Sequence, residues 1–168
     1  LKLRNGGHQQ VIMEDESRLI GRCALPLTLQ EKLRAAPLVV LDASLEDRVH
    51  HSWENYILSN YREQVALCDS HEAAFSAFAT SLRLSLANIQ KRLGGARYQE
   101  LSEVLEKALL AHSQGDPEQH KQWITVLLRD YYDPMYDYQL KSKQRHVVFR
   151  GNFNEVLEFM TGTIGSRA

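Results

Sequence analysis

The chain has 168 residues, of which 43% are hydrophobic and 24% are charged, and its formal net charge at pH 7 is −1. These proportions exclude a disordered or low-complexity chain and are typical of one globular domain, or at most two small ones. No apolar run approaches the roughly 20 residues that span a bilayer, and two cysteines cannot build a disulfide framework, so we expect a cytoplasmic protein without membrane contact. The sequence pI near 6.7 confines any nucleic-acid binding to a local patch of cations.

Short apolar runs predict strands near both ends of the sequence. Residues 11–13 and 37–42 are such runs, and residues 27–35 between them have helical character. Residues 146–149 form a third run, which leads to Asn152, a residue that can cap a helix. Alternating buried strands and helices predict a βαβ arrangement with a parallel sheet.

The middle of the sequence predicts a bundle of helices. Ser44 can cap one helix, Asp69 or Ser70 can cap the next, and Asp116-Pro117 combines a cap with a first-turn proline. Apolar residues recur at a helical period after these caps but not in strict heptads, which favours a packed bundle over a coiled coil. We therefore predict a mostly helical α/β fold in which a parallel sheet carries a large helical insertion. The expected parts are residues 1–43, residues 44–144, and residues 145–168, which return a strand and a helix to the first part.

Familiar catalytic signatures are missing from the sequence. It holds no Gly-x-x-x-x-Gly-Lys-Ser/Thr phosphate loop, no Gly-x-Gly-x-x-Gly and no Gly-x-Ser-x-Gly. His71-Glu72 begins like a zinc-protease motif, but Phe75 stands where the second histidine is needed. Cys23 and Cys68 have no partner at metal-binding spacing. We predict no metal site and leave the catalytic residues unassigned.

A dense set of charges follows the first predicted strand. Residues 14–22 read Glu-Asp-Glu-Ser-Arg-Leu-Ile-Gly-Arg, at the edge where open α/β sheets bind ligands. Acidic groups there can hold Mg²⁺ or orient a hydroxyl, and arginines can pair bidentately with phosphate. The alternative is a solvated loop with local ion pairs, and Asp42, which ends the second strand, is expected to cap a helix. The predicted phosphate- or substrate-binding residues are Glu16, Ser17, Arg18, Arg22 and Arg48.

A second segment, residues 129–138, reads Arg-Asp-Tyr-Tyr-Asp-Pro-Met-Tyr-Asp-Tyr and is far richer in tyrosine than the rest of the chain. Tyrosine rings can stack on bases or other flat apolar groups, and adjacent cations suit a nucleic-acid surface. The alternative is a helix break at Asp133-Pro134. A further cationic cluster, Lys91, Arg92 and Arg97, is interpreted as a helix C-terminal charge pattern. The predicted binding residues are Arg129, Tyr131, Tyr132, Tyr136, Lys141, Lys143, Arg145 and Arg150.

These two segments, together with residues 37–48, closely resemble the bacterial tRNA 2-selenouridine synthase family, also called tRNA 2-selenouridine/geranyl-2-thiouridine synthases. The resemblance spans nearly the whole chain, in order, and is most specific in the tyrosine-rich run. The residues that carry it are Glu14-Asp15-Glu16-Ser17-Arg18-Leu19-Ile20-Gly21-Arg22, Pro37-Leu38-Val39-Val40-Leu41-Asp42 with Leu45-Glu46-Asp47-Arg48, and Arg129-Asp130-Tyr131-Tyr132-Asp133-Pro134-Met135-Tyr136.

The resemblance implies an enzyme in which a rhodanese-like domain precedes a P-loop domain with a helical portion. Its implied reaction replaces sulfur by selenium in 2-thiouridine at the tRNA wobble position, through an S-geranylated intermediate. Selenophosphate and geranyl diphosphate are the implied substrates, and a selenophosphate-supplying synthase is an implied partner. The resemblance implies no covalently bound cofactor and leaves a Mg²⁺ requirement open. The strand-end residues would then hold the diphosphate or selenophosphate group, and the tyrosines and following cations would hold the tRNA or the prenyl chain.

The sequence departs from the family pattern by omission, because it has neither a rhodanese-type cysteine loop nor a phosphate loop. It opens at Leu1 without a methionine, in a segment that is typical of a helix end. We therefore expect a C-terminal part of such an enzyme, beginning inside a partial P-loop-type domain. By itself this part should bind a diphosphate weakly and should not complete the selenation.

Two other functions fit the same residues. A nucleotide-kinase-like phosphotransferase would use the βαβ units and the strand-end acids, and nucleotide turnover by the chain alone would identify it. A non-catalytic helical binding module would dock a protein on the tyrosine run, and tyrosine substitutions would then abolish protein binding and leave tRNA affinity intact. The family resemblance favours the synthase.

Overall fold

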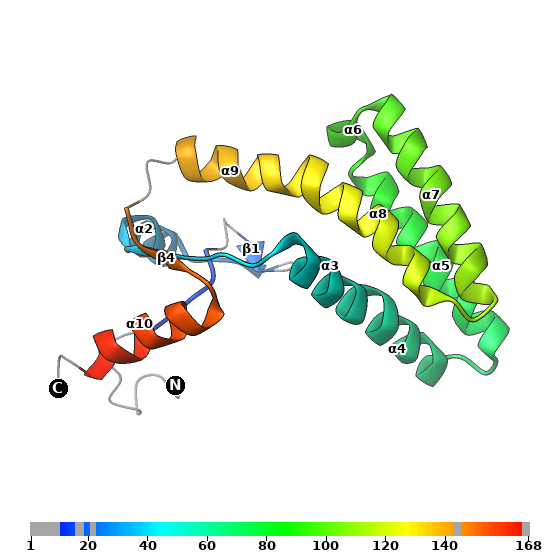
Figure 1. Ribbon diagram of the computed structural model, residues 1–168, viewed down its shortest axis with the longest axis horizontal. Helices are drawn as coiled ribbons and strands as arrows, with labels where there is room; N and C mark the ends of the chain where they lie inside the picture. Colours follow the sequence, from blue (N-terminus) through cyan, green and yellow to red (C-terminus); the bar gives the residue numbers. More distant parts are fainter. Residues whose placement is uncertain (1–10, 16–18, 21–22, 143–145, 166–168) are drawn as a thin grey trace. The chain divides into compact units, whose positions relative to one another are not determined.

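The computed structural model of the chain describes residues 11–15, 19–20, 23–142 and 146–165. Two compact units make up the chain, one formed by Leu1–Ala43 with Leu140–Ala168 and the other by Ser44–Gln139. Figure 1 labels the helices and strands of both units. Most of the described residues are helical and the strands are short, which confirms a mostly helical α/β fold.

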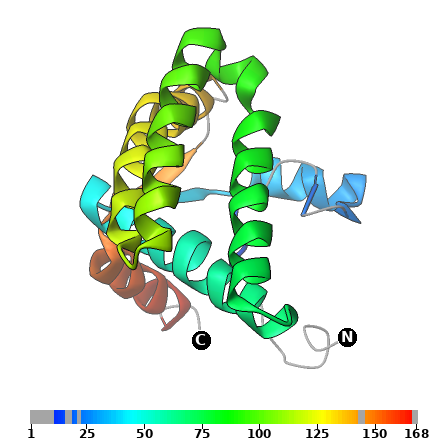
Figure 2. The ribbon, with the colours of Figure 1, turned by 90° about the vertical axis from the view of Figure 1, so that its right-hand side faces the viewer.

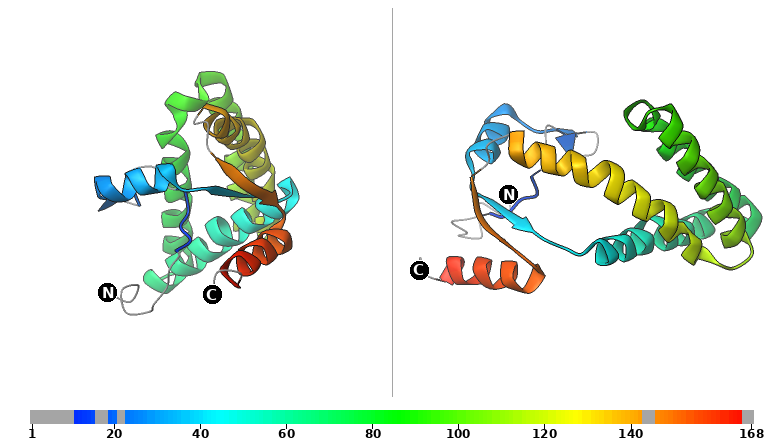
Figure 3. Two further views of the ribbon diagram at one scale, coloured as in Figure 1. Left: turned by 90° about the vertical axis from the view of Figure 1, so that its left-hand side faces the viewer. Right: turned by 45° about the horizontal axis from the view of Figure 1, so that its top comes forward.

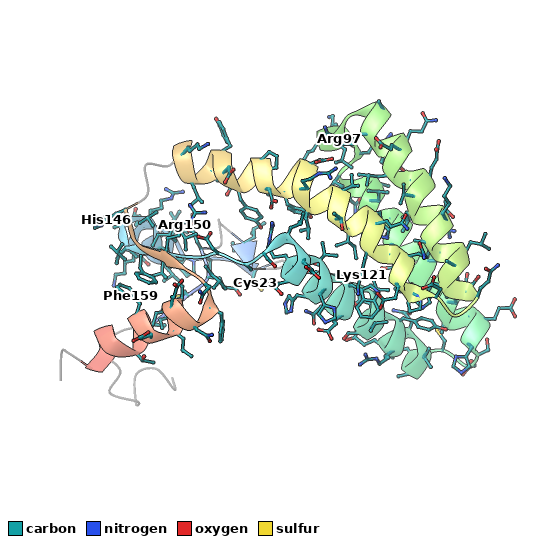
Figure 4. The ribbon with its side chains drawn as sticks, in the orientation of Figure 1. Cys23, Arg97, Lys121, His146, Arg150 and Phe159 are labelled. Carbon is teal, nitrogen blue, oxygen red and sulfur yellow. The ribbon has the colours of Figure 1, made fainter. Side chains whose placement is uncertain are left out.

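Two parallel strands form the main sheet of the first unit. Strand β3 (Leu38–Leu41) pairs with β4 (Val147–Gly151), and the register is irregular after Leu38. The parallel pairing of the second and third predicted strands is therefore confirmed. Beyond the end of β3, Arg150 donates from Nε and Nη2 to the Asp42 carboxylate at 2.7 and 2.9 Å (Figure 4). The predicted capping role of Asp42 is wrong, because its side chain pairs with the neighbouring strand and Ser44 caps the next helix.

Two helices of the first unit begin where the sequence predicts. Helix α2 (Leu27–Ala35) follows Pro26, and α10 (Phe153–Gly165) follows Asn152. The Asn152 Oδ1 accepts from the Glu155 amide at 3.1 Å, and the Glu155 Oε2 accepts from the Asn152 amide at 2.8 Å. This reciprocal pair is a capping box, which satisfies amide groups that the first turn of a helix leaves without partners.

The first predicted strand, by contrast, is wrong. Residues 11–15 are irregular, and the side chains of Val11, Ile12 and Met13 are 54%, 64% and 41% exposed. Instead, two short segments later in the chain, β1 (Leu19–Ile20) and β2 (Cys23–Ala24), pair as antiparallel strands. A continuous apolar run forms a buried parallel strand only where neighbouring strands and covering helices exclude water from both faces, and the exposed run at residues 11–13 lacks that cover.

The second unit is a bundle of helices. Helices α5 and α7 lie side by side as an antiparallel pair (Figure 2), and the last helix of the bundle continues past Gln139. The elements are α3 (Leu45–Trp53), the π-helical turn η1 (Glu54–Ser59), α4 (Asn60–Leu67), α5 (His71–Asn88), α6 (Gln90–Leu93), α7 (Gly95–Ser113), the 3-10 turn η2 (Pro117–Gln119), α8 (His120–Leu127), the π-helical turn η3 (Leu128–Tyr132) and α9 (Asp133–Ser142).

Local capping explains where these helices start. The Ser44 hydroxyl accepts from the Asp47 amide at 3.0 Å, and the Ser70 hydroxyl accepts from the Ala73 amide at 3.1 Å. The Asp116 carboxylate likewise accepts from the Glu118 amide at 3.1 Å, so all three predicted caps are confirmed. Between α6 and α7 the chain reverses at Gly94, whose φ of +80° and ψ of 159° lie in a region that a residue with a Cβ adopts at a cost of about 1–3 kcal/mol.

Helical periodicity gives the second unit one contiguous apolar core. Ile57, Phe78 and Leu101 are at most 1% exposed. Burial of such a side chain stabilises the fold by about 1.5–3 kcal/mol, so the core holds the helices of this unit together. The buried cluster consists of Val49, Trp53, Ile57, Phe78, Ala79, Leu82, Leu86, Leu93, Leu101, Leu105, Leu109 and Ile124.

A pair of buried histidines extends this core. His120 is fully buried and His112 is 9% exposed, and the His112 Nδ1 lies 3.2 Å from the His120 Nε2. The Trp123 Nε1 donates to the His120 Nδ1 at 2.9 Å, so the neutral His120 carries its proton on Nε2 and donates it to His112. Burial lowers the pKa of His120 to about 4, with a smaller contribution from His112, and burial also lowers the pKa of His112.

Acidification should therefore destabilise the second unit. Below a pH of about 6.5 the unfolded chain binds protons at both imidazoles, whereas the folded chain does not bind one at His120 until about pH 4. The free energy of unfolding therefore decreases as the pH is lowered from about 6.5 to about 4. For His120 alone we expect a loss of about 2 kcal/mol between pH 7 and pH 5. Urea denaturation at a series of pH values measures this loss, and His71→Gln, at an exposed histidine, should leave it unchanged. A free energy that is constant between pH 7 and pH 5 would contradict the prediction.

No helix in the described part of the chain is both long enough and apolar enough to cross a membrane.

Candidate binding site

The tyrosine-rich run lies within one continuous helical segment, in which α8 passes through η3 into α9 (Figure 3). The alternative interpretation of Asp133-Pro134 as a helix break is therefore wrong. A proline inside a helix removes one hydrogen-bond donor and its ring crowds the preceding turn, at a cost of about 3 kcal/mol in a regular α-helix. Here the wider π-helical turn comes directly before it, and the Asp133 amide donates to the Leu128 carbonyl five residues back.

Four tyrosines from two π-helical turns and α9 gather around this segment. The rings of Tyr131 and Tyr132 meet edge to face at 4.9 Å between centroids, and those of Tyr132 and Tyr136 stack at 6.3 Å. Tyr56 on η1 is 63% exposed and Tyr136 is 57% exposed, whereas Tyr131 and Tyr132 are half-buried. We call these four residues, Tyr56, Tyr131, Tyr132 and Tyr136, the tyrosine patch.

The environment of Tyr132 shows how closely the tyrosine patch is assembled. Burial raises the pKa of the Tyr132 hydroxyl, and the neighbouring Tyr131, Tyr136 and Tyr56 raise it further, while Arg92 acts in the opposite direction. The hydroxyl is therefore neutral at physiological pH and can both donate and accept hydrogen bonds.

Two arginines from the α6–α7 corner contact the same segment. A hydrogen bond with the Tyr131 side chain raises the pKa of Arg92, and the Arg97 Nη1 donates to the Asp130 carbonyl at 3.1 Å. Arg92 lies in the last turn of α6, as predicted, but Arg97 lies in the first turn of α7, so its interpretation as a C-terminal charge is wrong. Local sequence patterns do not place Tyr56, Arg92 or Arg97 in the site, because their partners lie more than thirty residues away along the chain. The Gly94-Gly95 pair, which reverses the chain between these arginines, is the one local signal of their proximity.

Two ion pairs lie close to the tyrosine patch along the chain. Arg129 donates from Nε and Nη2 to the Asp130 carboxylate at 2.6 and 2.9 Å, which lowers the pKa of Asp130. Arg48 on α3 makes a bidentate pair with Asp133 at the start of α9, with its Nη2 3.0 Å from the Asp133 Oδ2. The Arg48 guanidinium, which the sequence analysis assigned to phosphate, is thus engaged by a carboxylate 85 residues away along the chain.

The other predicted binding residues are not brought to the tyrosine patch by any described contact. Lys141 is exposed in the last turn of α9, and Arg150 pairs with Asp42 in the first unit. Six more lie outside the described residues, namely Glu16, Ser17, Arg18, Arg22, Lys143 and Arg145.

The chemistry of this site is that of binding. It presents aromatic rings with their hydroxyls and two guanidinium groups, of which Arg92 lies beside Tyr131 and Arg97 donates to a backbone carbonyl. Within residues 11–15, 19–20, 23–142 and 146–165, no group of three or more His, Cys, Asp or Glu side chains is placed to hold a metal ion. Such a surface suits a ligand that combines flat rings with negative charge.

The Arg48–Asp133 pair should contribute to the stability of the second unit. Both side chains are 34% exposed, so we expect a coupling free energy of about 1 kcal/mol in a double-mutant cycle of Arg48→Ala and Asp133→Ala. The matched control is Arg83–Glu106, whose side chains are 49% and 52% exposed and whose coupling should be below about 0.5 kcal/mol. Urea denaturation of both cycles gives the comparison, and equal couplings would contradict a structural role that is specific to Arg48.

Comparison with known proteins assigns the chain to a family. The family model described as the AAA domain of tRNA 2-selenouridine synthase matches residues 1–166. The chain is 47% identical over 169 residues to the tRNA 2-selenouridine synthase of Hahella chejuensis. This match covers 100% of the chain and 44% of that protein. It is 45% identical to the synthases of Ectopseudomonas mendocina and Azotobacter vinelandii, over 95% of the chain and 43% of each relative.

The chain thus spans less than half the length of the curated relatives that it matches. No solved structure matches it. Because the family model covers nearly every residue, the tyrosine patch included, the chain belongs to the tRNA 2-selenouridine synthase family.

Proposed function

We propose that this chain is the part of a tRNA 2-selenouridine synthase that binds the tRNA, and that the tyrosine patch contacts its unpaired nucleotides. The observation that carries this proposal is the gathering of four tyrosines at η3, with Arg92 beside Tyr131 and Arg97 bonded to Asp130. Every base has a π-face, so stacking on tyrosine tolerates any sequence, and guanidinium groups add attraction to phosphate. The same rings could hold a prenyl chain by apolar contact, but the surrounding cations favour a nucleic acid.

For the whole synthase we propose the reaction that the family resemblance implies. Selenium would replace sulfur in wobble 2-thiouridine through an S-geranyl intermediate, with geranyl diphosphate and selenophosphate as substrates. The enzyme would act in the cytoplasm and receive selenophosphate from a separate synthase. In this proposal the chain contributes substrate binding to a protein that, among its relatives, is more than twice as long.

The first unit would belong to a P-loop-type sheet in this proposal. Its support is the parallel pair of β3 and β4, in which the charged residues Asp42 and Arg150 lie at the carboxyl end of the strands, where open α/β sheets bind ligands. Glu16, Ser17, Arg18 and Arg22 would complete a phosphate site there.

Removal of one exposed ring should weaken tRNA binding. We expect Tyr136→Ala to lower the affinity for a labelled tRNA that carries wobble 2-thiouridine by about tenfold, the contribution of one stacked base, and Tyr136→Phe to retain most of it. Fluorescence anisotropy at fixed salt measures both. Tyr138→Ala is the matched control, because Tyr138 is 72% exposed on the same helix but is not part of the tyrosine patch. Equal losses for Tyr136→Ala and Tyr138→Ala, or no loss for either, would refute the assignment.

The cations after the tyrosine run should contribute to tRNA affinity by neutralising phosphates of the tRNA. The triple change Lys141→Ala, Lys143→Ala and Arg145→Ala should flatten the dependence of tRNA affinity on salt concentration, by about 0.7–0.9 in logarithmic slope for each phosphate that is no longer neutralised. Binding titrations between about 50 and about 200 mM salt, a range over which counterion release changes the affinity strongly, measure the slope. An unchanged slope would exclude these three cations from the tRNA interface.

A further inference from the structure

Pro134 removes a hydrogen-bond donor from the helix that carries the tyrosine patch. In an α-helix the amide of residue 134 would donate to the carbonyl of Asp130, four residues back, but proline has no amide hydrogen. The π-helical turn η3 contains Asp130 and ends at Tyr132, two residues before Pro134. Pro134 therefore leaves the Asp130 carbonyl without the donor that a regular α-helix would give it.

Arg97 supplies that donor from the α6–α7 corner. Its Nη1 lies 3.1 Å from the Asp130 carbonyl oxygen, and Figure 4 labels Arg97 near the start of α7. A cation in the first turn of a helix is disfavoured by the helix dipole, and α7 has no acidic residue in that turn to offset it. The placement of Arg97 is thus unfavourable for α7 itself and is accounted for by its contact with η3.

The surrounding contacts leave this role to Arg97. The Asp130 carboxylate pairs with Arg129, and the charge of Arg97 adds to the lowering of its pKa, but the hydrogen bond from Arg97 goes to the backbone carbonyl. Next along the turn, Tyr131 lies close enough to Arg92 of α6 to raise the pKa of that arginine. The α6–α7 corner therefore approaches two consecutive residues of η3, and Arg97 donates the hydrogen bond to the Asp130 carbonyl.

We propose that Arg97 is a positioning residue that takes the place of the missing Pro134 amide, holds the π-helical turn η3 in shape, and so sets the directions of the Tyr131 and Tyr132 rings. The effect of Arg97 on tRNA binding rests on the proposed function, whereas the effect of its hydrogen bond on the shape of η3 does not. A positioning role differs from direct phosphate binding by Arg97, because only a positioning role depends on residue 134.

The first test needs no tRNA. Amide hydrogen exchange of residues 128–133 should accelerate about tenfold in Arg97→Ala, the effect of one hydrogen bond from a charged donor. In a Pro134→Ala background, where residue 134 regains its amide, Arg97→Ala should change the exchange little. Lys91→Ala, at an exposed cation of the neighbouring α6, is the matched control and should have no effect. Equal acceleration by Arg97→Ala with and without Pro134 would overturn the proposal.

The second test follows the consequence for the ligand. Arg97→Ala should weaken binding of the labelled tRNA by about tenfold without changing the salt slope, and Pro134→Ala should restore most of the affinity. A slope that falls by about 0.7–0.9, with the same loss of affinity in the Pro134→Ala background, would identify Arg97 as a phosphate-binding residue and overturn the positioning role. If the unaltered chain does not bind tRNA, the proposed function fails, while the exchange experiment still decides whether Arg97 holds η3.

Discussion

The proline at position 134 is the constraint around which the candidate site is organised. A helix that continues through a proline must find another arrangement for the carbonyls of the preceding turn, and here it does so by widening into the π-helical turn η3. Arg97 then satisfies the Asp130 carbonyl, and Asp133 is held by Arg48. The tyrosine patch is assembled at this irregular turn, where a regular helix would direct the same side chains differently.

The core of the second unit makes such an irregular turn tolerable. Phe78, Leu101 and Leu105 are almost fully buried, and the same helices enclose the His112–His120 pair, whose hydrogen bonds continue to Trp123 on α8. Because α8 is anchored in this way, the regular helical geometry changes only where η3 begins. The exposed tyrosines then stand on a firmly packed scaffold, which reduces the entropy that ordering them on a ligand would cost.

Local patterns account for much of this fold. Ser44, Ser70 and Asp116 mark helix starts because capping depends on residues three or fewer positions apart, and the apolar runs at residues 37–42 and 146–149 become paired strands. The run at residues 11–13 fails as a strand, because burial on both faces depends on partners that no local pattern contains. Asp42 does not cap a helix for a related reason, because its carboxylate pairs with Arg150, which lies 108 positions further along the chain.

The sequence by itself determined that the tyrosine-rich run is exceptional, that it lies beside helical segments, and that the chain resembles its family. Only the tertiary structure decided which side chains join that run. Tyr56, Arg92 and Arg97 reach it from other helices, and Arg48 is drawn to Asp133 rather than left open for a phosphate. The physical reason is that spacing along the sequence shows which residues, three and four positions apart, are neighbours on one helix. Contacts between helices depend instead on how their buried faces pack.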